Sequence, residues 1–255
     1  MTTSAIVLAA GKGTRMKSEL PKVLHPVCEK PMVLHIIEKL DAIGVQDKIV
    51  VIGHKGEMVK EVIGSGVEYA EQTVQKGTGH AVMQAVPLLN KEGNTIIITG
   101  DTPLIQEKTI LSLLEQHKQL DNDGTVLITK FDDPTGYGRI IRNSSEEVVG
   151  IVEEKDASDA QKSIQEVNTG IFCFKNKALI EGLPLIDSNN AQNEYYLTDM
   201  VSVLNSQGKK FGSYLLLDNE QVMGVNDREQ LAQAEYIMKK YNSVLLSNEE
   251  IEKLS

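Results

Sequence analysis

Residues 8–22, LAAGKGTRMKSELPK, constrain this chain more than any other segment. They follow the apolar run of residues 5–8, which predicts a buried strand, so the glycine-rich turn begins where that strand ends. Glycines let the main chain approach an anion closely, while Arg15 offers a planar donor fork and Lys22 a compact charge. The segment is therefore a candidate polyphosphate site.

Two known phosphate-binding patterns do not fit this turn. A Walker A loop reads GxxxxGK[ST], and a dinucleotide fingerprint reads GxGxxG at the start of a helix. Here Gly11 and Gly13 are followed by a polar stretch that closes with Pro21 and Lys22, which predicts an extended loop that folds over a ligand. The alternative is an ordinary glycine turn with surface lysines.

The next segments predict a crossover between parallel strands. Residues 31–44 carry apolar side chains at helical spacing and end at a glycine, and residues 48–52 form a continuous apolar run typical of a strand buried on both faces. Residues 94–99 repeat that strand pattern, and residues 108–120 predict another helix. Strand, helix and strand in this order imply a right-handed crossover and an α/β fold.

Polar residues that could meet a ligand follow these strands. Asp101 comes just past residues 94–99, and ligands of open α/β sheets lie at the carboxyl ends of strands. It is either a Mg²⁺ ligand or a turn or cap aspartate. Gly77, Thr78 and Gly79 precede a helix, and Gln72 offers the donor and acceptor that a uracil edge needs. A simple helix-entry turn is the alternative for this loop.

Beyond residue 125 the pattern becomes richer in short strands. Strands are predicted at residues 126–128, 170–174 and 213–217, with a tight loop at 132–138 and a hairpin at 139–152. This part is expected to be an insertion that lies over the ligand edge of the sheet. Residues 190–199 lead into a helix, and a last helix follows Asn226, which with Glu229 also forms a capping-box-like start.

Composition excludes several classes of partner. The formal charge of −10 and the pI near 5.1 argue against nucleic acid or an anionic membrane as the main partner. No apolar run approaches the roughly 20 residues that cross a bilayer, and no signal peptide is recognisable, so a cytoplasmic location is expected. Cys28 and Cys173 are expected to be packing residues, and His25, His35 and His54 structural ones.

The motifs LAAGKGTRM and PKVLHPV resemble those of the sugar-1-phosphate nucleotidylyltransferases, and among them the N-terminal domain of the bacterial bifunctional N-acetylglucosamine-1-phosphate uridylyltransferases. The likeness runs in order through about residues 5–240. It implies a nucleotidyltransferase fold: a Rossmann-like, mostly parallel sheet flanked by helices, with a β-rich sugar-binding insertion. Residues 1–241 would form the domain, with a nucleotide-binding half at about 1–124, a sugar-binding half at 125–224, and a tail at 242–255.

The same resemblance implies roles for individual residues. Lys22 would hold the α-phosphate, Arg15 the departing pyrophosphate, and Asp101 with Asn226 a Mg²⁺ ion. Further nucleotide- and substrate-binding positions are Leu8, Ala9, Ala10, Gly11, Gly13, Thr14, Gln72, Gly77, Thr78, Thr99, Gly100, Gly138, Glu153, Asn168, Tyr196 and Thr198. For Tyr196 and Thr198, packing and N-capping are equally good interpretations.

The expected reaction joins UTP and N-acetylglucosamine 1-phosphate to give UDP-N-acetylglucosamine and pyrophosphate, for peptidoglycan precursor synthesis. Residues 242–255 show no hexapeptide repeat, so an acetyltransferase β-helix is not expected, and trimerisation is doubtful with it. Two alternatives stay open: transfer with another nucleotide or another sugar 1-phosphate, and a nucleotide-sugar sensor without catalysis.

Overall fold

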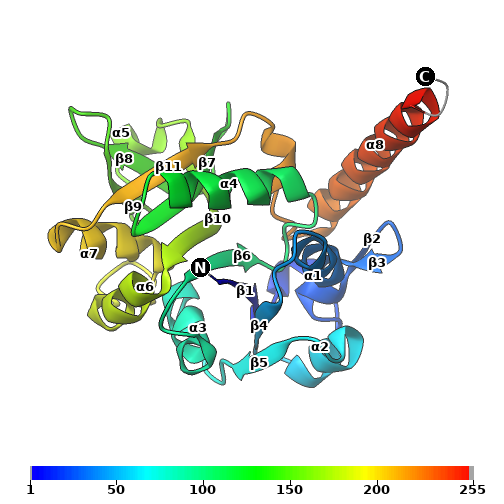
Figure 1. The fold of residues 1–255 in the computed structure, drawn as a ribbon, viewed down its shortest axis with the longest axis horizontal. Helices are drawn as coiled ribbons and strands as arrows, with labels where there is room; N and C mark the ends of the chain where they lie inside the picture. The colour runs from blue at the N-terminus through cyan, green and yellow to red at the C-terminus, as the bar shows by residue number, and fades with distance from the viewer. Residues whose placement is uncertain (1, 253–255) are drawn as a thin grey trace.

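The computed structural model describes residues 2–252 and is organised around a nine-stranded sheet (Figure 1). Seven strands follow one another across it in the order β11-β7-β10-β6-β1-β4-β5. In chain order these are β1 (Thr3–Ala9), β4 (Asp47–Ile52), β5 (Glu68–Glu71), β6 (Asn94–Thr99), β7 (Gly124–Lys130), β10 (Glu166–Lys175) and β11 (Phe211–Leu215).

The sheet is mostly parallel, as the sequence predicts. Strand β1 lies between β4 and β6 and is parallel to both, and β5 and β11 extend the parallel pairing at the two edges. Only β10 runs antiparallel to its neighbours β6 and β7 in this path. The ends of β1, β4 and β6 therefore meet at one edge of the sheet, where Ala9, Ile52 and Thr99 are the last residues of the three strands.

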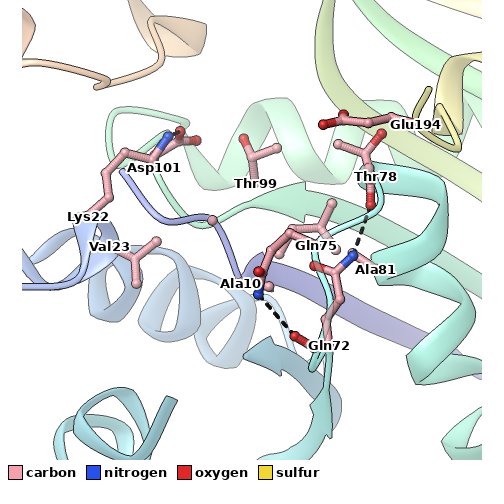
Figure 2. Close-up of a pocket in the computed structure, with 13 residues that line it drawn as sticks. Ala10, Lys22, Val23, Gln72, Gln75, Thr78, Ala81, Thr99, Asp101 and Glu194 are labelled. Atoms are coloured by element: carbon pink, nitrogen blue, oxygen red, sulfur yellow. Dashed lines mark hydrogen bonds and ion pairs between the residues drawn. The ribbon is translucent and has the colours of Figure 1, made fainter. Parts of the chain in front are cut away.

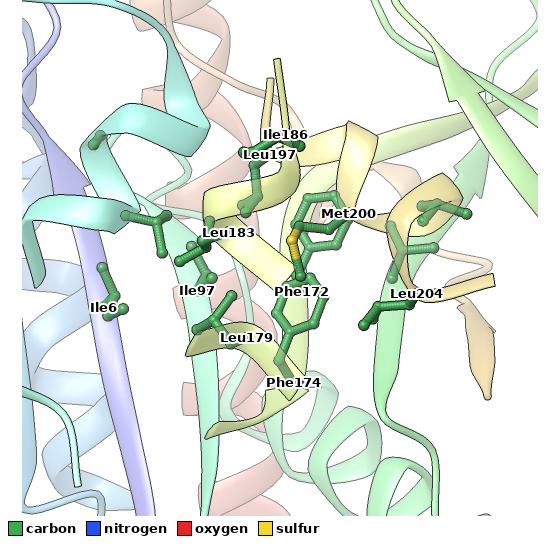
Figure 3. Close-up of a cluster of buried hydrophobic side chains, with 14 of the residues drawn as sticks. Ile6, Ile97, Phe172, Phe174, Leu179, Leu183, Ile186, Leu197, Met200 and Leu204 are labelled. Carbon is green, nitrogen blue, oxygen red and sulfur yellow. The ribbon is translucent and has the colours of Figure 1, made fainter. Parts of the chain in front are cut away.

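Helices cover both faces of the sheet (Figure 1). Side chains of α1 (Met32–Ala42), α2 (Gly56–Ile63) and α4 (Glu107–Gln119) share one apolar cluster, and those of α3 (Thr78–Ala85), α6 (Asn176–Gly182) and α7 (Met200–Ser206) share the other. Alternation along β1 sends Ile6 into the second cluster and Val7 into the first. Figure 3 shows the second cluster, with Phe172 and Phe174 beside Leu179 and Met200.

Most elements follow the sequence pattern, and the differences have physical reasons. The helices predicted at 31–44 and 108–120 are α1 and α4, and the strands predicted at 48–52 and 94–99 are β4 and β6. Helix α2 and strand β5 were not predicted, because both are short and β5 is an edge strand with two exposed glutamates. The loop expected to be extended before Pro21 contains single 3₁₀ turns at Thr14–Met16 and Lys22–Leu24.

The second half of the chain adds strands to the same sheet. The hairpin predicted at 139–152 is β8 (Arg139–Arg142) paired with β9 (Val148–Val152), and β8 joins the sheet through β10. A bulge interrupts the pairing of β10 with β7 between Asn168 and Phe172, where Gly170 has a φ of +80°. Such a bulge redirects side chains, and this one lies opposite the carboxyl end of β6.

Helix α8 (Arg228–Glu252) extends away from the body of the molecule (Figure 1). Its first turns dock through Ala234, Ile237 and Met238 on the small hairpin of β2 (Pro26–Val27) and β3 (Lys30–Pro31). The short helix α5 (Asp159–Lys162) completes the elements. None of the described helices is both long and apolar enough to span a membrane. The division into a nucleotide half and a sugar half stays a prediction.

Candidate functional site

Two adjoining cavities open at the edge where β1 and β6 end. The first, of about 290 Å³, is lined on one side by Lys22 and Asp101 and on another by Gln72 and Gln75 (Figure 2). The second, of about 340 Å³, lies over the bulge of β10. Leu8, Thr78 and Thr99 line both cavities, so the two spaces meet above the end of β6.

Lys22, Asp101 and Asn226 meet where the two cavities join. The Lys22 ammonium makes an ion pair with Asp101 Oδ2 and donates a hydrogen bond of 3.0 Å to Asn226 Oδ1. The side chains of Lys22 and Asp101 are only 16% and 15% exposed, so this ion pair is largely shielded from solvent. Asp101 and Asn226 thus present two oxygen atoms to a single cation, although 125 residues separate them.

The backbone explains how distant residues converge here. The backbone N–H of Val225 donates to the carbonyl oxygen of Asp101 at 2.9 Å, which fixes residues 224–226 against the end of β6. The start of α8 is capped by Asp227, whose Oδ1 accepts from the backbone N–H of Gln230 at 2.9 Å. The capping role that the sequence allowed for Asn226 therefore belongs to its neighbour, and the Asn226 carbonyl oxygen faces Lys22 instead.

The glycine-rich turn places Lys22 by leaving room for it. Gly13 has a φ of +59°, and a Cβ there would lie 2.5 Å from Lys22 Cβ. A residue with a side chain at position 13 would therefore displace the lysine. Gly100 performs a similar service between β1 and β6, because its N–H donates to Leu8 O at 2.8 Å while a Cβ would touch Val23.

The loop before α3 forms the wall opposite Lys22. Gly77 has a φ of +101°, and a Cβ there would lie 2.5 Å from Tyr195 O. The Thr78 hydroxyl accepts from the backbone N–H of Leu197 at 3.0 Å, so it ties this loop to the segment before α7. Gln72 is 3% exposed, and its amide nitrogen donates to Gly77 O at 3.0 Å.

The second cavity gathers polar groups that suit a sugar. Thr198 Oγ1 donates to Glu153 Oε1 at 3.0 Å, and burial raises the pKa of the Glu153 carboxyl. Asn168 Oδ1 accepts from Gly170 N–H at 2.9 Å and its own N–H donates to Gly138 O at 2.8 Å, which holds the bulge open toward the cavity. Burial, with Asp187 and Asp156 nearby, raises the pKa of Asp199 to about 6.

Most of the expected site residues line one of the two cavities. They are Leu8, Ala10, Gly11, Lys22, Gln72, Gly77, Thr78, Thr99 and Asp101 in the first, and Gly138, Glu153, Asn168, Thr198 and Asn226 in the second. The roles assigned to them stay predictions.

Six expected residues do not line either cavity. Thr14 and Arg15 are exposed on the 3₁₀ turn after Gly13, and Ala9 and Gly100 are buried at the ends of their strands. Gly13 acts through Lys22, as described above. Tyr196 is 7% exposed, and its hydroxyl accepts from Gln192 Nε2 at 2.8 Å. The packing interpretation of Tyr196 thus describes its surroundings better than a contact with the sugar.

Several lining residues were not assigned a role from the sequence. Gln75, Val23, Ala81 and Glu194 line the first cavity, and Gly136, Tyr137, Thr169, Gly170, Phe172 and Leu197 line the second. A signal existed for two of them. Glu194 lies within the polar run before α7, and Gly170 follows Asn168 in a strand pattern, where a glycine indicates a bulge.

Comparison with known proteins places the chain in a family. The family model described as nucleotidyl transferase matches residues 4–222. The bifunctional protein GlmU of Brevibacillus brevis is 50% identical over 237 residues, which are 92% of this chain and 51% of that protein. The protein of the same name from Streptococcus gordonii is 49% identical over 241 residues, covering 94% of this chain and 52% of the relative. The chain therefore spans about half the length of these curated relatives.

A solved structure supports the same fold. The putative glucose-1-phosphate thymidylyltransferase of Bacillus anthracis, crystallised with sucrose, superimposes with a TM-score of 0.73 over 92% of this chain and 95% of that one. The two sequences are 20% identical, so this likeness concerns the fold alone. With the family model matching most of its length, the chain belongs to the nucleotidyl transferase family.

Proposed function

We propose that this chain catalyses the Mg²⁺-dependent transfer of a uridylyl group from UTP to N-acetylglucosamine 1-phosphate. The products are UDP-N-acetylglucosamine and pyrophosphate, and the former serves cell-wall precursor synthesis. The observation that carries the proposal is the meeting of Lys22, Asp101 and Asn226 at the junction of two cavities. Similarity to proteins named GlmU supports the choice of nucleotide and sugar.

The residues present suit a magnesium ion. Asp101 and Asn226 offer a carboxylate and an amide oxygen, and Mg²⁺ is bound by oxygen ligands, with substrate phosphates completing its shell. The Lys22 ammonium already lies between these two oxygens and acts as a stand-in cation. When bound, Mg²⁺ neutralises charge on the phosphate oxygens and thereby favours departure of pyrophosphate.

In the proposed reaction an oxygen of the sugar phosphate attacks the α-phosphorus of UTP, and the bond to the pyrophosphate oxygen breaks. Phosphate monoesters have a second pKa near 6, so the nucleophile is already largely dianionic and needs no general base. The protein therefore contributes position and charge. Lys22, released from Asp101 and Asn226, neutralises the α-phosphate, and the exposed Arg15 is assigned to the departing pyrophosphate.

The two cavities divide the remaining substrate. The first, walled by Gln72 and the loop before α3, would hold the uridine. The second would hold the amino sugar, because Glu153 and Asn168 supply the acceptors and donors that hydroxyl and acetamido groups require. In-line attack needs the two substrates end to end, and the shared walls at Leu8, Thr78 and Thr99 allow that arrangement.

The test is a pyrophosphate-release assay on a panel of substrates. The purified chain would be given UTP, CTP or dTTP, each with N-acetylglucosamine 1-phosphate or glucose 1-phosphate, in Mg²⁺ and again in excess EDTA. The proposal expects UTP with N-acetylglucosamine 1-phosphate to give the highest kcat/KM, and EDTA to abolish release.

Each contrary result has a distinct meaning. A higher kcat/KM for another nucleotide or sugar would overturn the substrate assignment while leaving a nucleotidyltransferase. Binding of UDP-N-acetylglucosamine by calorimetry without pyrophosphate release from any pair would replace the enzyme by a sensor.

A further inference from the structure

His80, in the first turn of α3, directs its imidazole toward Gln72 at the wall of the first cavity. The Gln72 amide nitrogen lies 3.0 Å from His80 Nδ1 and 3.0 Å from Gly77 O. An amide nitrogen carries two protons. Both are thus directed at acceptors of the protein, and Gln72 Oε1 has no hydrogen-bond partner among residues 2–252.

This arrangement specifies the protonation of the histidine. Nδ1 can accept a proton from the amide only if it carries none itself, so the neutral ring holds its proton on Nε2. Gln84 Nε2 lies 3.4 Å from that ring nitrogen but donates to the His80 carbonyl oxygen at 3.0 Å. Partial burial and the nearby Lys76 lower the pKa of His80, which favours the neutral ring.

The opposite orientation of the Gln72 amide is unfavourable. Rotation by 180° would place Oε1 against two acceptors, Gly77 O and His80 Nδ1, while the amide protons would lose both partners. Leaving such buried groups unpaired costs about 1–3 kcal/mol. Gly77 O also accepts from Ala81 N–H at 3.1 Å, which holds it in place at the start of α3.

We propose that His80 is a positioning residue that holds the Gln72 amide with its oxygen toward the nucleotide base, and that this selects uracil over cytosine. The inference rests on the proposed function and deepens it. Uracil carries a proton on N3, which Oε1 can accept, whereas N3 of cytosine is itself an acceptor and would face the oxygen lone pairs. Thymine also has an N3 proton, so this device separates uracil from cytosine and not from thymine.

Two variants separate orientation from packing. His80→Leu keeps bulk but removes the acceptor, whereas an asparagine oxygen can take the place of Nδ1 in His80→Asn. Initial rates of pyrophosphate release with UTP and with CTP, at saturating N-acetylglucosamine 1-phosphate, give the ratio of the two kcat/KM values. We expect His80→Leu to lower the UTP:CTP ratio about 10-fold or more, mainly through KM, and His80→Asn to keep it within about 3-fold of the wild type.

An unchanged ratio in His80→Leu, or an equal loss in both variants, would overturn the proposal. A second measurement needs no variant: the ¹⁵N shifts of His80 in the wild-type protein report which ring nitrogen carries the proton. The proposal requires an unprotonated Nδ1 and a protonated Nε2, and a proton on Nδ1 at neutral pH contradicts it. If the wild type released no pyrophosphate from UTP, the proposed function would fail, while the His80 tautomer would still decide the orientation of Gln72.

Discussion

Lys22 is the residue on which the account of the site depends most. Its ammonium contacts Asp101 and Asn226, the two residues assigned to the metal, while its stem passes Gly13 at a distance that only glycine allows. The same ammonium is also assigned to the α-phosphate. Lys22 must therefore exchange one set of oxygens for another when substrate and metal bind.

Replacing Lys22 tests this role in the rate. We expect Lys22→Ala to lower kcat/KM for pyrophosphate release by on the order of 10²- to 10³-fold, because an electrostatic contact to the transferred group is lost. Lys22→Arg, which keeps the charge but not its compact shape, should recover only part of that loss. Thermal unfolding would verify that both variants fold, and turnover near the wild-type rate in Lys22→Ala would refute the assignment.

Gly77 provides a residue-scale test of the loop before α3. With a φ of +101° and a Cβ that would lie 2.5 Å from Tyr195 O, Gly77→Ala must move the backbone that Gln72 contacts. We expect a rise in KM for UTP of about 10-fold or more, since small displacements of a positioning group are costly. Gly208→Ala is the matched control, because its φ is also positive, at +67°, and nothing lies within 4 Å of its Cβ. Equal KM values in the two variants would argue against the role of the loop.

Single residues show how far sequence reasoning reaches. Gly11, Lys22 and Asp101 could be selected because each lies directly after a predicted strand, where ligands bind. The contribution of Tyr137 or Leu197 could not, because each enters the second cavity only through the way the later strands fold back.

Among the elements, β10 joins the two cavities into one site. It is the antiparallel strand between β6 and β7, and its bulge at Asn168–Gly170 faces the end of β6. The strand was predicted only for residues 170–174, because the bulge interrupts the alternating pattern that identifies a strand. Its antiparallel direction depends on pairing between distant residues, which local pattern does not report.

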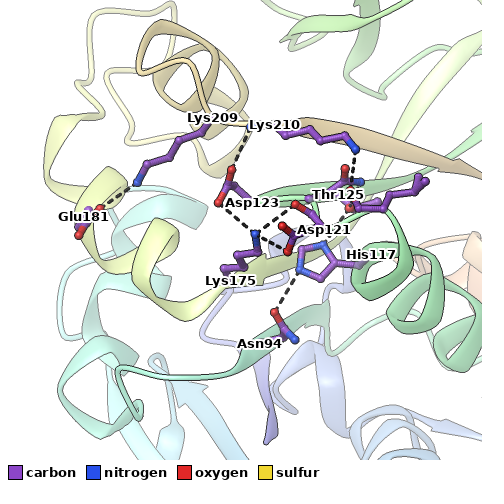
Figure 4. A network of polar contacts seen from close by, with 11 residues as sticks. Asn94, His117, Asp121, Asp123, Thr125, Lys175, Glu181, Lys209 and Lys210 are labelled. Carbon is purple, nitrogen blue, oxygen red and sulfur yellow. Dashed lines mark hydrogen bonds and ion pairs between the residues drawn. The ribbon is translucent and has the colours of Figure 1, made fainter. Parts of the chain in front are cut away.

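Helix α4 is fastened to the sheet by a buried histidine (Figure 4). His117 Nδ1 lies 2.9 Å from Thr125 Oγ1 in β7, and Nε2 lies 3.3 Å from Asn94 Oδ1 in β6. Because the asparagine oxygen can only accept, Nε2 must donate, which leaves Nδ1 to accept from the threonine hydroxyl. The neutral ring therefore satisfies both neighbours. Burial, with Lys175 nearby, lowers the pKa of His117 to about 4.

This histidine predicts a pH dependence of stability. In the unfolded chain its pKa is near 6.5, so between pH 6.5 and 4 the unfolded state binds the proton more readily and stability falls with pH. The full shift corresponds to about 3 kcal/mol. In urea unfolding, His117→Gln should be less stable than the wild type at pH 7.5, and the difference should shrink toward pH 4. His35, whose pKa is also lowered, is present in both proteins and cancels. A difference that stays constant with pH would contradict the assignment.

At the scale of the whole molecule, the parallel strands bring distant segments together. Strands β1 and β6 are neighbours, so the glycine-rich turn after β1 meets Asp101 after β6, and the loop before α8 returns to the same edge. The α/β class and this edge follow from strand and helix patterns in the sequence. The place of Asn226 does not, because locally it forms as good a helix start as it does a ligand, and only the contact of Val225 with Asp101 decides its position.

The most direct test of this account is the affinity for Mn²⁺ without nucleotide, measured from the free-ion signal in electron paramagnetic resonance. If Lys22 occupies the cation position between Asp101 and Asn226, removing its charge in Lys22→Ala should tighten Mn²⁺ binding relative to the wild type. Adding Asp101→Ala or Asn226→Ala to that variant should abolish the gain. Mn²⁺ binding by Lys22→Ala that is no tighter than in the wild type, or that survives loss of either oxygen ligand, would contradict the account.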